Sequence, residues 1–191
     1  MPSAVAHAFF PLVMGKALTP KEMTARFWTF SVLCSILPDI DTFGIFFGIR
    51  NGEFLGHRGF THSLLFAALL SLLAVGLTFK DSNPFSGSSW KLWLYFFFLS
   101  SSHGFLDSMT NGGQGVAFLS PLDTTCYFFP WRPMKVSPIG LHFYLGPWGG
   151  EVSLSEITWV WIPSLFLLAG IKGIRRWVPG WIFRESRAAE G

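Results

Sequence analysis

Long apolar runs alternate with short polar stretches along this chain, and the runs have the length of helices rather than of strands. The helical segments predicted from the pattern are residues 3–15, 27–37, 62–79, 92–109 and 157–175, with a shorter apolar stretch at 43–49. A helix needs about 20 predominantly apolar residues to cross a bilayer, and residues 62–79 approach that length. The pattern therefore predicts an all-α integral membrane bundle of four to five helices.

Polar stretches mark the connections between these segments. Residues 16–26 carry charged side chains around Pro20, and residues 80–91 are rich in Ser, Gly and Asn, so both are typical of turns. Pro38 predicts the end of the second helix, because proline lacks an amide hydrogen and clashes with the preceding turn. The stretch 43–49 is too short to cross a membrane alone.

The last third of the chain predicts a different kind of connection. Residues 110–156 are rich in glycine, proline and aromatic residues, which predicts a long irregular segment before the last helix. We expect one membrane-embedded helical domain over residues 1–175, carrying the functional site, and a polar cytoplasmic tail over residues 176–191.

The composition agrees with a membrane protein. Half of the residues are apolar and only 13% are charged, whereas soluble domains have about 25% charged residues. The net charge of +3 is not evidence for a nucleic-acid partner, because Lys and Arg in membrane proteins mark the cytoplasmic side. Cys34 and Cys126 form neither a disulfide framework nor a CxxC motif. The first residues lack the basic start of a signal peptide, so we expect the helices themselves to hold the protein in the membrane.

The basic residues divide unequally if the five segments alternate in direction. One side receives Lys16, Lys21, Arg26, Lys80, Lys91, Lys172, Arg175, Arg176, Arg184 and Arg187, and the other receives Arg50, Arg58, Arg132 and Lys135. Ten against four predicts that the first side is cytoplasmic and that the protein passes the membrane several times.

The same alternation brings the polar residues of the apolar segments to one end. His7, Asp39, Asp41, His57, His62, His103 and Asp107 all fall at the non-cytoplasmic end of the predicted bundle. Ionisable residues inside a membrane are costly and are functional candidates by default. Histidine nitrogen with carboxylate oxygen suits zinc first, with manganese or iron as alternatives. Seven candidates exceed the three or four ligands of one catalytic zinc, so we predict one or two ions.

The spacing of these residues leaves several roles open. His103 and Asp107 share a helix face, so both can bind one metal, the carboxylate can orient the imidazole, or the two can form a structural pair. Asp39 can bind metal, act as general base or cap a helix, and Asp41 shares the first two roles. His7 is equally well explained by a hydrogen bond between helices.

Two further polar residues are weaker candidates for the site. His142 has no spaced partner and is predicted to be interfacial, and Asp123 is predicted to form an Asx turn.

The basic residues near the predicted site suggest a phosphate ligand. Guanidinium groups bind phosphate in bidentate fashion, so we expect Arg132, Lys135 and Arg58 to receive a lipid phosphate. Arg132 and Lys135 can instead anchor the chain at the interface beside Trp131. Arg58 can instead neutralise the carboxylates of the metal site.

Several short motifs resemble a known family. They are His7, residues 38–41 (PDID), 57–63 (HRGFTHS), 102–108 (SHGFLDS), 111–113 (NGG) and 128–133 (FFPWRP). Over residues 1–140 the chain resembles the YdjM family of bacterial membrane proteins, described as LexA-regulated, metal-dependent hydrolases. The resemblance implies a helical protein of the bacterial inner membrane whose His and Asp residues bind metal. All-helical zinc phospholipases C and related nucleases are similar in fold and ligand type.

The leading hypothesis is a metal-dependent hydrolase that cleaves an ester or phosphoester of a membrane lipid with metal-activated water. It would act from the non-cytoplasmic side, with Asp39, Asp41 and Arg58 as catalytic candidates. The alternative is a non-enzymatic metal-binding scaffold or stress-response regulator. A metal transporter is less favoured, because the ionisable residues gather at one end. The sequence leaves open the substrate, the oligomeric state and whether both His57 and His62 touch metal.

Overall fold

Helices account for most of the described chain. The structure is a computed structural model, and it describes residues 1–191 except 20–22, 52, 79–86, 138–144 and 178–191. The elements are α1 (Ala4–Leu18), α2 (Ala25–Ile36), η1 (Leu37–Phe47), η2 (Phe60–His62), α3 (Leu64–Thr78), α4 (Gly87–Ser108), α6 (Pro147–Glu156), η3 (Ile157–Trp161) and α7 (Ile162–Trp177). Within these ranges backbone bridges occur only as two isolated pairs, so the predicted all-α bundle is confirmed.

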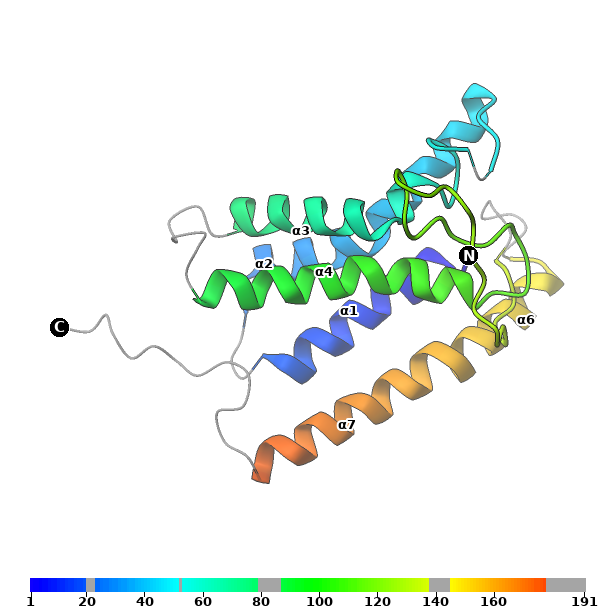
Figure 1. The fold of residues 1–191 in the computed structure, drawn as a ribbon. Coiled ribbons are helices and arrows are strands. Elements are labelled where there is room, and N and C mark those ends of the chain that lie inside the picture. The colour runs from blue at the N-terminus through cyan, green and yellow to red at the C-terminus, as the bar shows by residue number, and fades with distance from the viewer. Residues whose placement is uncertain (20–22, 52, 79–86, 138–144, 178–191) are drawn as a thin grey trace.

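The helices lie lengthwise beside one another (Figure 1). α4 packs against α2 and α3, and α1 packs against α2 and α7. The N-terminus, η1 and the segment between α4 and α6 gather at one end of the bundle, which we call the site end. The other end holds the C-terminal ends of α1, α3 and α7, and we call it the basic end.

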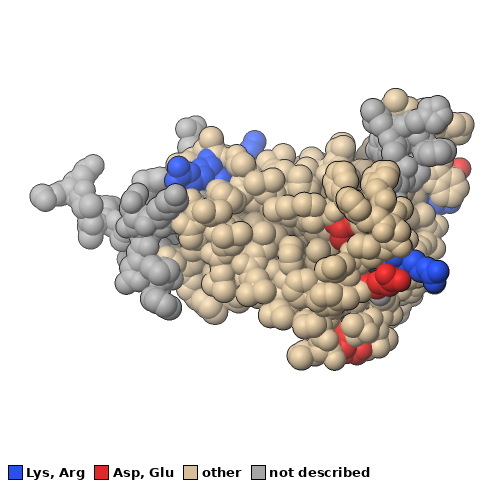
Figure 2. All heavy atoms as spheres, turned by 90° about the horizontal axis from the view of Figure 1, so that it is seen from above, with Lys and Arg blue, Asp and Glu red and all other residues tan. Residues whose placement is uncertain are grey.

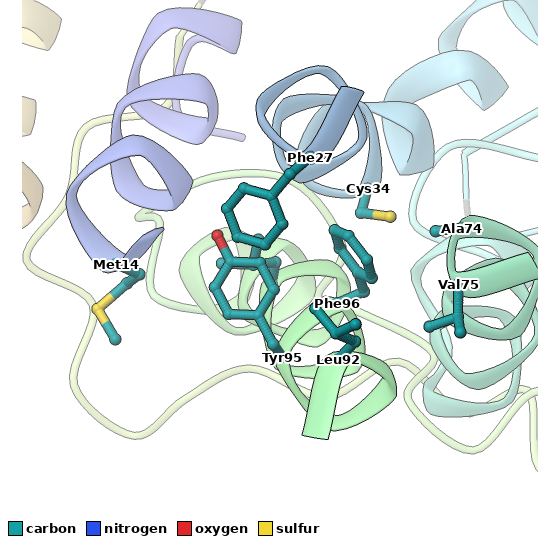
Figure 3. Close-up of a cluster of buried hydrophobic side chains, with 9 residues drawn as sticks. Met14, Phe27, Cys34, Ala74, Val75, Leu92, Tyr95 and Phe96 are labelled. Atoms are coloured by element: carbon teal, nitrogen blue, oxygen red, sulfur yellow. The ribbon is translucent and has the colours of Figure 1, made fainter. Parts of the chain in front are cut away.

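Aromatic packing joins α2 to α4 in the centre of the bundle (Figure 3). The rings of Phe27 and Tyr95 stack with centroids 5.1 Å apart, and Phe96 and Cys34 pack beside them. Gly15 of α1 lies so close to the indole ring of Trp28 that a Cβ atom would overlap it. A glycine at this position therefore lets α1 approach α2.

Arg175 connects α7 to α1 at the basic end. Its guanidinium donates hydrogen bonds to the carbonyl oxygens of Ala17 and Thr19. The last carbonyls of a helix have no partner within the helix, so this contact satisfies the C-terminal end of α1.

Of two predicted boundaries, one is found in the structure and one differs. The α-helix α2 ends at Ile36, as Pro38 predicts, and the chain continues as the 3₁₀ helix η1, because proline is tolerated in the first turn, where its missing amide hydrogen is not needed. The last helix begins at Pro147 rather than at residue 157, again with proline in the first turn. The predicted irregular segment is thereby shorter. Residues 176 and 177 of the predicted tail belong to α7, while its residues 178–191, like His142, lie outside the described residues.

The surface is suited to a bilayer. Ala25–Phe47 and Pro147–Trp177 are long and apolar enough to cross a membrane, while Ala4–Leu18 and Leu64–Leu77 are apolar but shorter. α3 exposes Leu65, Leu69 and Leu72. Figure 2 shows charged side chains mainly toward the two ends, with a broad uncharged surface between them.

Candidate metal site

A tight turn before α3 positions the histidine motif of residues 57–63. Arg58 adopts a left-handed backbone conformation with φ of 69°, which is uncommon for a residue with a side chain. Gly59 lies against the backbone oxygens of Glu53 and Phe54, where a Cβ atom would overlap them. The turn thus needs a glycine, and it directs His57 and His62 inward, where both are buried.

Three buried side chains and the partly buried Asp39 converge beneath this turn. Nε2 of His62 and Nε2 of His103 are 3.1 Å apart, and Oδ1 of Asp39 lies 3.2 Å from Nε2 of His103 and 3.6 Å from Nε2 of His62. Oδ2 of Asp107 lies 3.5 Å from Nε2 of His62. These four residues, from η1, η2 and α4, form what we call the primary cluster.

The hydrogen bonds of the two imidazoles determine which nitrogens have a free lone pair. Nδ1 of His103 lies 2.7 Å from the carbonyl oxygen of Ser35, which can only accept, so Nδ1 carries the proton. Nδ1 of His62 lies 3.0 Å from Oδ2 of Asp41, an acceptor as well. In their neutral forms both rings therefore direct an Nε2 lone pair into the primary cluster.

Asp41 lies behind the cluster and receives donors at both oxygens. Oδ1 faces Nδ1 of His57 at 2.9 Å, and Oδ2 accepts from the amide of Arg58 at 3.1 Å. The hydroxyl of Thr61 and Nδ1 of His62 also contact Oδ2. A carboxylate has about four lone-pair sites, so these contacts use its accepting capacity. Asp41 thus orients both histidines of the motif, as carboxylates do behind metal-binding imidazoles.

A second group, Asp39, Asp41, His57 and His62, also has its potential ligand atoms within 4.8 Å of one another. It shares Asp39 and His62 with the primary cluster. Because the oxygens of Asp41 are occupied by donors, the geometry favours the primary cluster as the position of an ion.

His7 reaches the cluster from α1. Its ring stacks on that of His103 with centroids 3.8 Å apart, and its Nε2 lies 3.3 Å from Oδ1 of Asp107. Ser35 donates a hydrogen bond to the carbonyl oxygen of His7 and so fixes this turn of α1 against α2. The imidazole of His7 thus contacts α4 by stacking on His103 and by directing Nε2 at a cluster carboxylate, and neither ring nitrogen has a hydrogen-bond partner among the described residues.

Arg58 compensates part of the negative charge of the site. Its Nε lies 3.3 Å from Oδ2 of Asp107, and its other nitrogens donate to the carbonyl oxygen of Gly112 and the hydroxyl of Thr110. Gly113 faces the guanidinium so closely that a side chain there would overlap it. All three nitrogens therefore have internal partners, which favours charge neutralisation over capture of a lipid phosphate.

The residues present fit a divalent cation. Oδ2 of Asp39, both carboxylate oxygens of Asp107 and both ring nitrogens of His7 are buried without a hydrogen-bond partner. Buried polar groups in native proteins are almost always paired, because an unpaired group costs about 1–3 kcal/mol. A cation among these lone pairs would satisfy them, and histidine with carboxylate matches the ligands of zinc, manganese and iron.

Among the described site residues, exposure is found on the side of Asp39 and His57. The side chains of His7, His62, His103 and Asp107 are fully buried, whereas those of Asp39 and His57 are 13% and 7% exposed. A pocket of about 100 Å³ adjoins this side and is lined by His57, Arg58, Gly113 and Gln114 among others. A water molecule or a substrate group would reach the cluster past Asp39 and His57.

The other predicted residues lie outside the cluster. Arg132 is exposed and its guanidinium covers the ring of Phe128 at 4.4 Å, and Lys135 pairs with Glu151 at 3.2 Å. Neither of these described contacts reaches the cluster.

Asp123 forms the predicted Asx turn, since its Oδ1 accepts from the amide of Thr125 at 2.8 Å. The hydrogen bonds from Thr125 and from the Tyr127 hydroxyl lower the pKa of the Asp123 carboxyl.

Several contributors were not predicted. The carbonyl of Ser35 and the hydroxyl of Thr110 orient site residues, but neither atom has a sequence signature. Glu156 binds the amide and hydroxyl of Ser3 at the start of α1. Glu156 is the last residue of the segment predicted to be irregular, so no sequence signal indicated its buried position.

Comparison with known proteins gives two matches. The chain matches the family described as YdjM inner membrane protein over residues 1–178. It is also similar to the inner membrane protein YbcI of Escherichia coli (strain K12), with 38% identity over 176 residues, or 92% of this chain and 100% of that protein. No solved structure matches. Both matches describe inner membrane proteins, which agrees with the uncharged surface of the bundle.

Proposed function

Because the chain belongs to the YdjM family of inner membrane proteins, we propose that it is a membrane-bound metal-dependent hydrolase that cleaves an ester or phosphoester of a membrane lipid. It passes the bacterial inner membrane several times, with the basic end in the cytoplasm and the site on the non-cytoplasmic side. Ten of the 14 Lys and Arg residues on the predicted cytoplasmic side support this orientation.

The observation that carries the proposal is the set of buried acceptors without donors. Asp39 and Asp107 direct carboxylate oxygens, and His62 and His103 direct Nε2 lone pairs, into one small volume. When both neutral rings carry their proton on Nδ1, their Nε2 lone pairs face each other at 3.1 Å and no hydrogen bond between them satisfies this contact. A divalent ion, zinc in the first instance, explains the arrangement and supplies Lewis acidity and activation of water when it is bound.

The residues around the cluster have distinct roles in this proposal. Asp41 holds His57 and His62 in the orientation that turns Nε2 of His62 toward the cluster. Asp39 is the most exposed carboxylate of the site, and its Oδ2 has no hydrogen-bond partner. It therefore takes the proton of the attacking water. Arg58 balances Asp107, and Arg132 and Lys135 bind the lipid phosphate from the exposed side.

The test is metal analysis followed by lipid digestion. Protein purified in mild detergent and loaded with zinc, manganese or iron is expected to hold a stoichiometric ion and to convert one lipid of a bacterial phospholipid panel. Chelation abolishes the conversion and readdition of metal restores it. Asp123→Asn serves as a control, because Asp123 lies in an exposed turn. Metal-loaded protein that changes no lipid contradicts the hydrolase proposal.

One observation favours a non-enzymatic scaffold. The pocket beside the site, at about 100 Å³, has room for a phosphate-sized group rather than for a whole lipid. A scaffold would bind the metal with the same residues and release no product from any lipid, which the same experiment would show.

A further inference from the structure

The lengths of the helices indicate how deep the cluster lies in the bilayer. α1 and α3 each have 15 residues and start at the cluster, α1 with His7 in its second turn and α3 directly after His62. At about 1.5 Å per residue each helix rises about 22 Å. The hydrocarbon core is about 30 Å thick.

The basic end provides the reference level for this depth. Lys16 and Arg175 lie in the last turns of α1 and α7, where basic residues of membrane helices meet the headgroups. His7 precedes Lys16 by nine residues on α1, which is a rise of about 14 Å, so the cluster remains well inside the far edge of the hydrocarbon. Side chains beside and beyond the cluster must then face acyl chains.

η1 has the side-chain pattern that such a position requires. A 3₁₀ helix has three residues per turn, so residues three apart form one row. Ile40, Phe43 and Phe46 form an exposed row, while Pro38 and Asp41 of another row are buried. The end of η1 is exposed on the other row as well, since Phe47 follows Asp41 by six residues and is 83% exposed. We call Ile40, Phe43, Phe46 and Phe47 the apolar face of η1, and Phe46 is 81% exposed.

The positions of the charged residues in and after η1 support the same acyl-chain environment. The only charged residues of η1 are Asp39 and Asp41, and both turn toward the cluster. The first outward charges after η1 are Arg50 and Glu53. The apolar face lies within the candidate span Ala25–Phe47. Figure 1 shows that η1 is directed away from α3 at the site end.

We propose that the apolar face of η1 lies among the acyl chains of the leaflet at the site end, so that the cluster meets its substrate from within that leaflet. The occupant of this surface is lipid. The substrate class is a glycerophospholipid, whose ester or phosphoester bond reaches Asp39 and His57 laterally, from within the leaflet. The inference rests on the proposed multi-pass placement and hydrolase function.

Spin labels in proteoliposomes test the depth. The background is Cys126→Ser, because the buried Cys34 does not react with a label. A nitroxide at Phe46→Cys is expected to be relaxed by oxygen and protected from a water-soluble nickel chelate, as is a label at Leu72→Cys on the exposed face of α3. A label at Glu53→Cys is the aqueous control and should show the reverse.

Two outcomes overturn the inference. Relaxation of the Phe46 label by the nickel chelate, as at Glu53, means that the apolar face lies in water. Protection from both reagents together with spin–spin broadening means that a second copy of the chain covers it. Metal content and lipid conversion are measured on the same samples, so a deep label without conversion contradicts only the proposed function, and a shallow label with conversion contradicts only the depth.

Discussion

Two aspartates, two residues apart on η1, differ in what their oxygens contact. Both oxygens of Asp41 face hydrogen-bond donors, whereas Oδ2 of Asp39 has no hydrogen-bond partner. Asp39→Asn is therefore expected to abolish stoichiometric metal binding. Asp41→Asn should keep the stoichiometry and weaken the affinity about 10- to 100-fold, as loss of a group that orients a ligand does. Metal titration of the two purified variants measures both effects.

Equal loss of metal in both variants would show instead that Asp41 binds the ion directly. Circular dichroism of each variant provides the folding control.

The gathering of the candidate residues at one end followed from sequence, because alternating segments bring the ends of helices together. Which nitrogen and oxygen atoms lack hydrogen-bond partners could not be predicted, since this depends on contacts between residues far apart in the sequence. Ser35 fixes the tautomer of His103 through a backbone carbonyl, and Thr110 holds Arg58, although neither residue carries a motif for this role. The predicted metal roles of the seven residues stay predictions.

At the scale of elements, the start of α1 controls the position of His7. Ser3 caps this helix through its hydroxyl and is held by the buried carboxylate of Glu156. Ser3→Ala should lower stability by about 1 kcal/mol or more, because it removes the cap and leaves an oxygen of Glu156 unpaired. It should also weaken metal binding. Thermal unfolding and metal titration in detergent give the two quantities.

Thr24→Ala is the matched control, because Thr24 caps α2 through the amide of Phe27. It should cost similar stability while metal affinity stays at the wild-type value. If both variants weaken metal binding equally, the effect of Ser3 comes from general loosening of the bundle.

The hydrophobic pattern predicted the long helices but not how two of them begin or continue. Pro38 marks the end of α2, but the pattern did not predict that the chain continues there as a 3₁₀ helix, and the glycine-rich composition concealed the helix that starts at Pro147. In both cases proline occupies a first turn, where tertiary packing decides whether a helix continues.

For the whole molecule, a bound ion would connect four elements. The ring of His7 belongs to α1, Asp39 to η1, His62 to η2, and His103 and Asp107 to α4. Metal at 1,000 times its dissociation constant should stabilise the fold by about 4 kcal/mol. The melting temperature should rise on loading and fall on chelation, whereas the His103→Ala variant should respond to neither.

The proposed orientation predicts which end reacts with reagents from outside the cell. In a Cys126→Ser background, a membrane-impermeant maleimide should label Glu53→Cys in spheroplasts and leave Lys91→Cys unlabelled until the membrane is opened. Both positions are exposed and lie at opposite ends of the bundle. The reverse pattern would place the site end in the cytoplasm.

The order in which the ligands occur along the chain bears on biogenesis. The primary cluster draws its members from residue 39 to residue 107, so the nascent chain has no complete ion site until α4 has left the ribosome and entered the bilayer. Until then Asp39 lacks its contact with His103, whereas Asp41 already has its donors from residues 57–62. An ion at the primary cluster would therefore bind late in membrane insertion, and it would join η1 to α4 only after both are in place.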